Sequence, residues 1–167
     1  MKNKFRLVCT LIVAQMSLAC WAQQDNLPAA ADSNTLRFQF SPFTLHYSPS
    51  DDHKPVWMVG LERETPQGKL DGFTYFSNSF GQPSAFIYPW GQNYRDFLGV
   101  NRLSWKWTAG LLYGYKEPYE NKVPLNYKGF SPGAILAVAY EFKSGWSAQL
   151  DMLGTSALMF QFNMPIK

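Results

Sequence analysis

The sequence predicts an all-β fold, an eight-stranded antiparallel transmembrane β-barrel, and three observations support this prediction. Residues 103–116 alternate between apolar and mostly polar or small side chains, which is the period-two pattern of a β-strand. The apolar face of this segment has tryptophans at one end, tyrosines at the other and aliphatic residues between, as membrane-spanning strands do. A secretory signal begins the chain, and no later run approaches 18 consecutive apolar residues. An exported chain with this patterning crosses a membrane as a closed barrel.

Residues 1–22 are predicted to be a secretory signal. Three basic side chains precede the apolar segment 7–18, and residues 20–22 form a small-x-small cleavage site. Residues 23–34 are interpreted as a flexible leader. The barrel is predicted to occupy residues 35–167.

Composition excludes several function classes once the signal is removed. The full chain has 15 basic and 12 acidic side chains, and three of the basic ones lie in the signal, so the mature chain is near neutral. A nucleic-acid partner is therefore not expected. Cys9 and Cys20, the two cysteines, also leave with the signal. The mature chain thus has no disulfide and no Cys-based metal site, and we expect neither a cofactor nor a metal.

Eight strands are predicted, at residues 35–47, 55–64, 70–78, 83–90, 103–115, 131–142, 146–153 and 156–164. Residues 65–69 and 143–145 have the composition of hairpin turns, and residues 48–54 that of a polar loop. Eight strands is an even number and the smallest common size for a bacterial barrel. Such a barrel is too narrow for a water-filled pore, so its interior is packed solid or holds one slim ligand such as an acyl chain.

Most of the remaining strands repeat the alternation of residues 103–115. The residues that share one apolar face are Trp57, Val59 and Leu61 of the second strand, Phe86, Tyr88 and Trp90 of the fourth, Leu136, Val138, Tyr140 and Phe142 of the sixth, Trp146, Ala148, Leu150 and Met152 of the seventh, and Leu158, Phe160 and Phe162 of the last. By this pattern, these faces meet lipid. Among the charged residues, Arg37, Lys106 and Asp151 are candidates for ion pairs in the lumen.

The candidate site lies at the outer rim of the barrel. With the N-terminus in the periplasm, the first and third strands both finish there, with His46 ending the first and Asn78-Ser79 ending the third. Only one strand separates them, so their side chains are expected within about 10 Å. A hydroxyl and an imidazole suffice for acyl transfer by an activated nucleophile or a general base. The alternative interpretation is a solvated rim histidine, and it is the favoured one for His53, which lies in a charged loop.

Residues 43 to 162 resemble the lipid A palmitoyltransferase (PagP) family of Gram-negative outer membranes, with similar spacing between the motifs. The segments that carry the resemblance are Leu45-His46, Lys54-Pro55, Val59-Gly60-Leu61-Glu62-Arg63, Asp71-Gly72-Phe73, Phe76-Ser77-Asn78-Ser79-Phe80, Thr108-Ala109-Gly110, Val123-Pro124-Leu125 and Phe160-Gln161-Phe162. The resemblance implies an eight-stranded barrel whose lumen measures one acyl chain. It implies an enzyme that moves a palmitoyl chain from a phospholipid to the lipid A of lipopolysaccharide.

The resemblance also implies roles for three residues. The essential histidine of the family falls on His46, and its Asp-Ser pair falls on Asn78 and Ser79. His46 would act as general base and then as general acid, and Ser79 would be either the attacking hydroxyl or a donor to the developing oxyanion. Asn78 could orient the imidazole, but an amide cannot stabilise an imidazolium by charge. The sequence also lacks the family's amphipathic helix before the first strand, and five residues follow Phe162.

The implied partners are a phospholipid acyl donor, a lipid A acceptor and the outer membrane itself, with the protein acting as a monomer. Two alternatives remain at this stage. One is a non-catalytic small outer-membrane barrel, structural or carrying an amphiphile. The other is a soluble periplasmic lipid carrier of lipocalin type, which would turn the apolar face of residues 103–115 inward.

Overall fold

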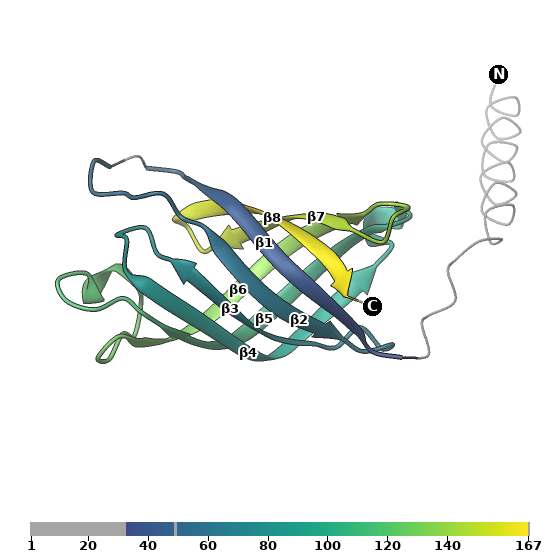
Figure 1. Cartoon of the computed structure of the whole chain (residues 1–167), viewed down its shortest axis with the longest axis horizontal. Coiled ribbons are helices and arrows are strands. Elements are labelled where there is room, and N and C mark those ends of the chain that lie inside the picture. The colour runs from purple at the N-terminus through teal and green to yellow at the C-terminus, as the bar shows by residue number, and fades with distance from the viewer. Residues whose placement is uncertain (1–32, 49, 167) are drawn as a thin grey trace, which may run out of the picture. The chain divides into compact units, whose positions relative to one another are not determined.

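The computed structural model describes residues 33–48 and 50–166, which form a closed barrel of eight antiparallel strands (Figure 1). Each strand pairs with the next in sequence, and the last pairs with the first. The strands are β1 (Thr35–His46), β2 (Met58–Glu64), β3 (Leu70–Ser77), β4 (Pro83–Arg95), β5 (Leu103–Tyr113), β6 (Phe130–Glu141), β7 (Ser147–Leu153) and β8 (Ala157–Ile166). The predicted signal, and the leader as far as residue 32, lie outside the described residues.

The predicted eight-stranded antiparallel barrel is confirmed, and the strand boundaries differ by more than two residues in two places. β2 begins three residues later than predicted, and β4 continues five residues past Trp90, to Arg95. Two short 3₁₀ turns, Phe97–Gly99 and Glu120–Lys122, lie in the loops on either side of β5. No helix in the described part of the chain is long and apolar enough to cross a membrane.

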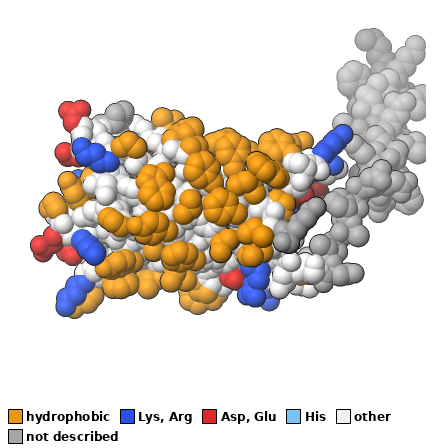
Figure 2. Space-filling view, viewed as in Figure 1, with side chains coloured by type: hydrophobic (Ala, Val, Ile, Leu, Met, Phe, Trp, Pro, Cys, Tyr) orange, Lys and Arg blue, Asp and Glu red, His pale blue; other side chains and the backbone are white. Residues whose placement is uncertain are grey.

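The outer surface of the barrel is largely apolar. Figure 2 shows hydrophobic side chains gathered over the middle of the barrel and charged side chains toward its two ends. The outward-facing residues of this apolar belt include Leu61, Phe73, Ile87, Leu111, Leu136 and Leu150, each between 42 and 54% exposed. The alternation predicted for the second, sixth and seventh strands is confirmed.

The prediction for the fourth strand is wrong. Phe86 and Tyr88 point into the lumen and are 4% and 3% exposed, whereas Trp90 faces outward at 65%. The cause is a shift in the register of β4 against β5 between Ile87 and Trp90, beside Pro89. Proline has no N–H to donate to the sheet, and an irregularity at this point reverses which face the following residues occupy.

A matching irregularity in β1 sets the direction of His46. The pairing of β1 with β8 shifts between Phe40 and Phe43, around Pro42. Before the shift the inward-facing residues have odd numbers, as Gln39 does; after it they have even numbers. His46 consequently points into the barrel mouth, whereas unbroken alternation from Gln39 would have turned it outward.

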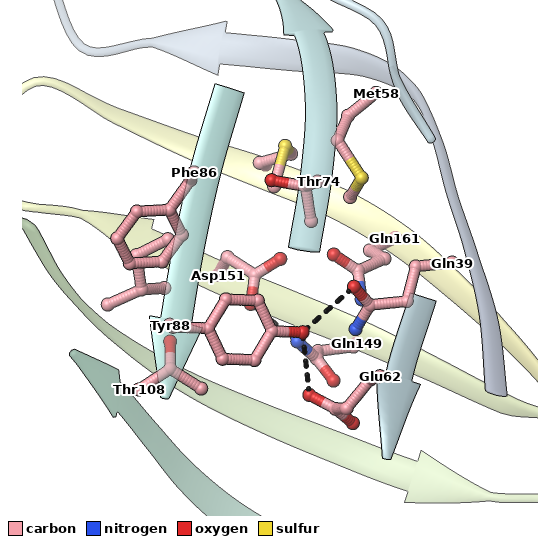
Figure 3. Close-up of a pocket in the computed structure, with 12 residues that line it drawn as sticks. Gln39, Met58, Glu62, Thr74, Phe86, Tyr88, Thr108, Gln149, Asp151 and Gln161 are labelled. Atoms are coloured by element: carbon pink, nitrogen blue, oxygen red, sulfur yellow. Dashed lines mark hydrogen bonds between the residues drawn. The ribbon is translucent and has the colours of Figure 1, made fainter. Parts of the chain in front are cut away.

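The lower lumen, at the end where β1 begins, is filled by polar side chains. Lys106 Nζ lies 2.5 Å from Glu62 Oε1 and also donates to Gln149. The Tyr88 hydroxyl lies between Gln39 and Glu62, at 3.1 and 3.3 Å from their oxygens (Figure 3). All five of these side chains are buried, so their hydrogen bonds offset the cost of removing them from water.

Two of the three residues predicted to form lumen ion pairs do so. Lys106 pairs with Glu62, and Arg37 reaches both Glu64 and Glu141, at 3.6 and 3.2 Å. Asp151 forms no ion pair with any described residue: Gln149 donates to its Oδ1, and its Oδ2 has no partner.

We expect Lys106→Met to lower the free energy of unfolding by about 3–5 kcal/mol, because it leaves the buried Glu62 carboxylate without its cation. The double variant Lys106→Met, Glu62→Gln should recover much of this loss, since it removes both charges. Equilibrium unfolding in urea from lipid vesicles measures the three free energies. A single variant as stable as the wild type would contradict this account of the lower lumen.

Candidate functional site

The upper lumen holds a cavity of about 720 Å³ that opens at the end where β1 and β3 finish. Its floor is mainly apolar, and it consists of Met58, Thr74, Phe86, Ile135 and Met159. The same five residues border a small polar pocket of about 40 Å³ beneath, which Figure 3 shows with Tyr88 and Asp151. The upper cavity falls within the range of about 300–1,000 Å³ that ligand pockets occupy.

The structure brings together two of the three predicted site residues at the mouth of this cavity. His46 is the last residue of β1, and Ser79 lies in the turn that follows β3. His46 Nε2 lies 2.7 Å from Ser79 Oγ, a strong hydrogen bond whose direction depends on the imidazole tautomer. In the tautomer with Nδ1 protonated, the serine hydroxyl donates to Nε2, which is the arrangement of an activated nucleophile.

Asn78, the third predicted residue, stabilises the turn and makes no hydrogen bond to His46. Its Oδ1 accepts from the backbone N–H groups of Phe80 and Gln82, both at 3.0 Å. Its Nδ2 donates to the Gln82 side chain and to the Gly114 carbonyl. Asn78 is 1% exposed and fixes the backbone that presents Ser79. The expectation that it orients the imidazole directly is therefore wrong.

The loop between β1 and β2 contributes a residue that the sequence interpretation missed. The rings of His46 and His53 have centroids 4.1 Å apart, with an angle of 31° between their planes. His53 also contacts the edge of Phe80, which stacks on Tyr119 at 4.1 Å. His53 therefore belongs to the wall of the mouth, and its interpretation as a merely solvated loop residue is wrong. A loop-mediated contact of this kind leaves no periodic signal in the sequence.

Tyr115 was predicted to lie on the outward apolar face at the end of the fifth strand, and this prediction is wrong, because β5 ends at Tyr113 and Tyr115 lines the cavity. Its side chain lies in the cavity wall close to Ser79. Burial raises the pKa of the Tyr115 hydroxyl above its ordinary value, and the nearby Ser79 side chain acts in the opposite direction to a smaller extent. The hydroxyl is therefore protonated at neutral pH and can donate. Asn126 secures this segment by donating to the Tyr115 carbonyl at 2.7 Å.

The surroundings of His46, at the rim of the barrel, favour its neutral form. Partial burial lowers the pKa of His46, and the nearby charge of His53 lowers it further. A neutral imidazole in contact with a hydroxyl is able to accept its proton. Among residues 33–48 and 50–166, no cluster of three or more His, Cys, Asp or Glu side chains is placed to hold a metal ion.

A scan against protein-family models finds no match for this chain. A search of the curated proteins likewise finds no significant match. The case for a function therefore rests on the geometry of His46 and Ser79, the cavity below them and the spacing of the motifs.

We expect Asn78→Asp to destabilise the barrel at neutral pH by about 1–3 kcal/mol, because a buried carboxylate would face the Gln82 and Gly114 oxygens that Asn78 Nδ2 now satisfies. Burial raises the folded-state pKa of the new carboxyl above its unfolded value. The loss therefore grows as pH rises through the acid range and shrinks when acid protonates the group. Unfolding free energies measured across this range test the prediction.

Asn101→Asp, at an exposed turn position, is the matched control for the added charge. We expect it to change the free energy of unfolding by less than about 0.5 kcal/mol. Equal stability of Asn78→Asp and the wild type at neutral pH would contradict the structural role assigned to Asn78.

Proposed function

We propose that the protein is an outer-membrane acyltransferase that moves a palmitoyl chain from a phospholipid to lipid A. The observation that carries the proposal is the 2.7 Å contact between His46 and Ser79 at the mouth of the upper cavity. A hydroxyl held against an imidazole beside a cavity of about 720 Å³ with a mainly apolar floor suits the transfer of an acyl group whose chain lies in the barrel.

The apolar belt supports placement in a membrane. Outward-facing leucines, isoleucines and phenylalanines cover the middle of a closed barrel that leaves no strand edge unpaired. Aromatic residues, among them Tyr47, Tyr94 and Tyr127, are exposed at or near the strand ends. An apolar band flanked by aromatic girdles is the pattern of barrels that lie in an outer membrane. It also argues against a soluble carrier, which would have its apolar faces inside.

The proposed reaction uses the two rim residues in sequence. The Ser79 hydroxyl attacks the donor ester carbonyl and transfers its proton to His46 Nε2. Collapse of the tetrahedral intermediate breaks the ester bond, and the lysophospholipid oxygen leaves with that proton. An acceptor hydroxyl of lipid A then attacks the acyl-serine while His46 takes up its proton, and Ser79 leaves with the proton restored.

Tyr115 is the candidate donor to the oxyanion in this scheme. The backbone N–H of Phe80, directly after Ser79, already donates to Asn78 Oδ1. A group other than this N–H must therefore stabilise the developing negative charge. The half-buried hydroxyl of Tyr115 lies near Ser79 and remains protonated, so it is available to donate to this charge.

If the apolar belt lies in the bilayer, Leu111→Arg should lower the free energy of unfolding from lipid vesicles by about 2–4 kcal/mol, because it places a cation at mid-membrane on the lipid face. Leu125→Arg is the matched control: Leu125 is 82% exposed in the loop between β5 and β6, and we expect little change. Recovery of the wild type in the soluble periplasmic fraction without detergent would rule out the membrane placement.

Ser79→Ala and His46→Ala should each abolish acyl transfer, because each removes one partner of the proton-transfer pair. Tyr115→Phe should lower the rate by about 10²–10³ through loss of the oxyanion donor. Ser77→Ala, two residues before Ser79 and outside the cavity wall, is the matched control and should keep full activity. The measurement is the mass spectrum of lipid A from cells that lack such an enzyme and express each variant at equal barrel abundance.

Two outcomes would contradict the acyltransferase proposal. Wild-type barrel folded in the outer membrane with no added acyl group on lipid A would favour the non-catalytic barrel. Full activity in His46→Ala would remove His46 from the mechanism even if transfer is observed.

A further inference from the structure

The described wall of the upper cavity contains one lysine, Lys122, and no arginine. Lys122 ends the short 3₁₀ turn in the loop between β5 and β6, and its side chain is exposed. Its Nζ lies 5.7 Å from the centre of the Phe80 ring, and Phe80 directly follows Ser79. The ammonium group is therefore placed near the candidate nucleophile.

The loop between β5 and β6 is fixed to the turn between β3 and β4. The ring of Tyr119 stacks on Phe80, with centroids 4.1 Å apart and 12° between the planes. The side chain of Gln82 makes three hydrogen bonds to the backbone of residues 116–117. Because these contacts join the two segments, the fold itself sets the position of Lys122 relative to the turn that carries the serine.

The ammonium group of Lys122 is available to a ligand. No carboxylate of the described residues forms an ion pair with it. Its contact with the Phe80 ring is of a kind that contributes little at an exposed site. Asp52, from the loop between β1 and β2, is the one acidic residue in the described wall, so an anion at the mouth is drawn to the Lys122 side.

The acyl donor of the proposed reaction brings an anion to this point. Its ester carbonyl must lie at Ser79, and its acyl chain then occupies the cavity below. In a glycerophospholipid the phosphate is only a few bonds from that ester, on the glycerol side, so it stays at the mouth when the chain is inside. Lysine binds phosphate as a compact charge on a flexible stem, which suits a mobile head group.

We propose that Lys122 binds the phosphate of the phospholipid donor and thereby holds the donor ester against Ser79. This inference rests on the proposed function, and it identifies the part of the donor that is recognised outside the lumen. Lys128 provides a matched control. It lies in the same loop, with its Nζ 5.4 Å from the Tyr127 ring, but outside the cavity wall.

Steady-state kinetics with two acyl donors in maltoside micelles, at saturating lipid A, test the inference. Dipalmitoyl phosphatidylcholine carries the phosphate, and dipalmitoylglycerol has the same esters without it. Lys122→Met should raise KM for the phospholipid about tenfold with kcat nearly unchanged, because it removes an interaction made equally in the ground and transition states. It should leave KM for dipalmitoylglycerol unchanged. Lys122→Arg should keep most of the affinity, and Lys128→Met should change neither KM.

A binding measurement covers the case in which no transfer is seen. Ser79→Ala prevents turnover, and phosphorus nuclear magnetic resonance then follows soluble dihexanoyl phosphatidylcholine added to the barrel in maltoside micelles, which contain no phosphorus. We expect the phosphate resonance to broaden with Ser79→Ala. The broadening should be lost when Lys122→Met is added to this variant and kept when Lys128→Met is added instead.

Three results would overturn the inference. The first is the same ratio of the two donors' KM values in Lys122→Met and the wild type, and the second is equal broadening with and without Lys122. The third is a change confined to the KM of lipid A, because the bound anion would then belong to the acceptor. Failure of the acyltransferase proposal is distinguishable: neither donor would lose an acyl group in the wild type, while the phosphorus resonance still reports whether Lys122 binds the phosphate.

Discussion

Pairing of β8 with β1 is the constraint on which the rest of the molecule depends. It leaves no edge strand, so every strand has a partner on both sides and all side chains point either into the lumen or away from it. A cylinder of eight strands has room inside for little more than side chains. In this protein polar groups fill the half around Lys106 and Glu62, and the other half is left hollow. The candidate site lies where the hollow half opens.

The sequence predicts the strands well because alternation is a local property. The faces of the second, sixth and seventh strands follow directly from their period of two. The prediction failed for the fourth strand at Pro89, where a register irregularity reverses the faces. The irregularity at Pro42 acts in the same way and turns His46 inward. Proline in a strand indicates that an irregularity is present, but which face each residue then takes depends on pairing with the neighbouring strand.

The candidate site was only partly predictable, for a related reason. Placing His46 and Ser79 at one rim requires only strand order and direction, and the structure brings them into contact. Asn78 was expected to orient the His46 imidazole. Its side-chain oxygen instead accepts hydrogen bonds from the backbone N–H groups of Phe80 and Gln82, as short polar side chains in turns commonly do. His53 and Tyr115 reach the site from segments outside the strands, whose paths no periodic pattern specifies.

The packed polar half of the lumen also determines by which route a molecule can enter and leave the barrel. The floor around Met58 and Met159 closes the upper cavity from below, so a chain that enters at the mouth leaves by the same opening. An eight-stranded barrel has room for one slim ligand at most, so successive ligands would have to bind one after another. In a barrel with one opening, a bound ligand must be released before the next one can bind.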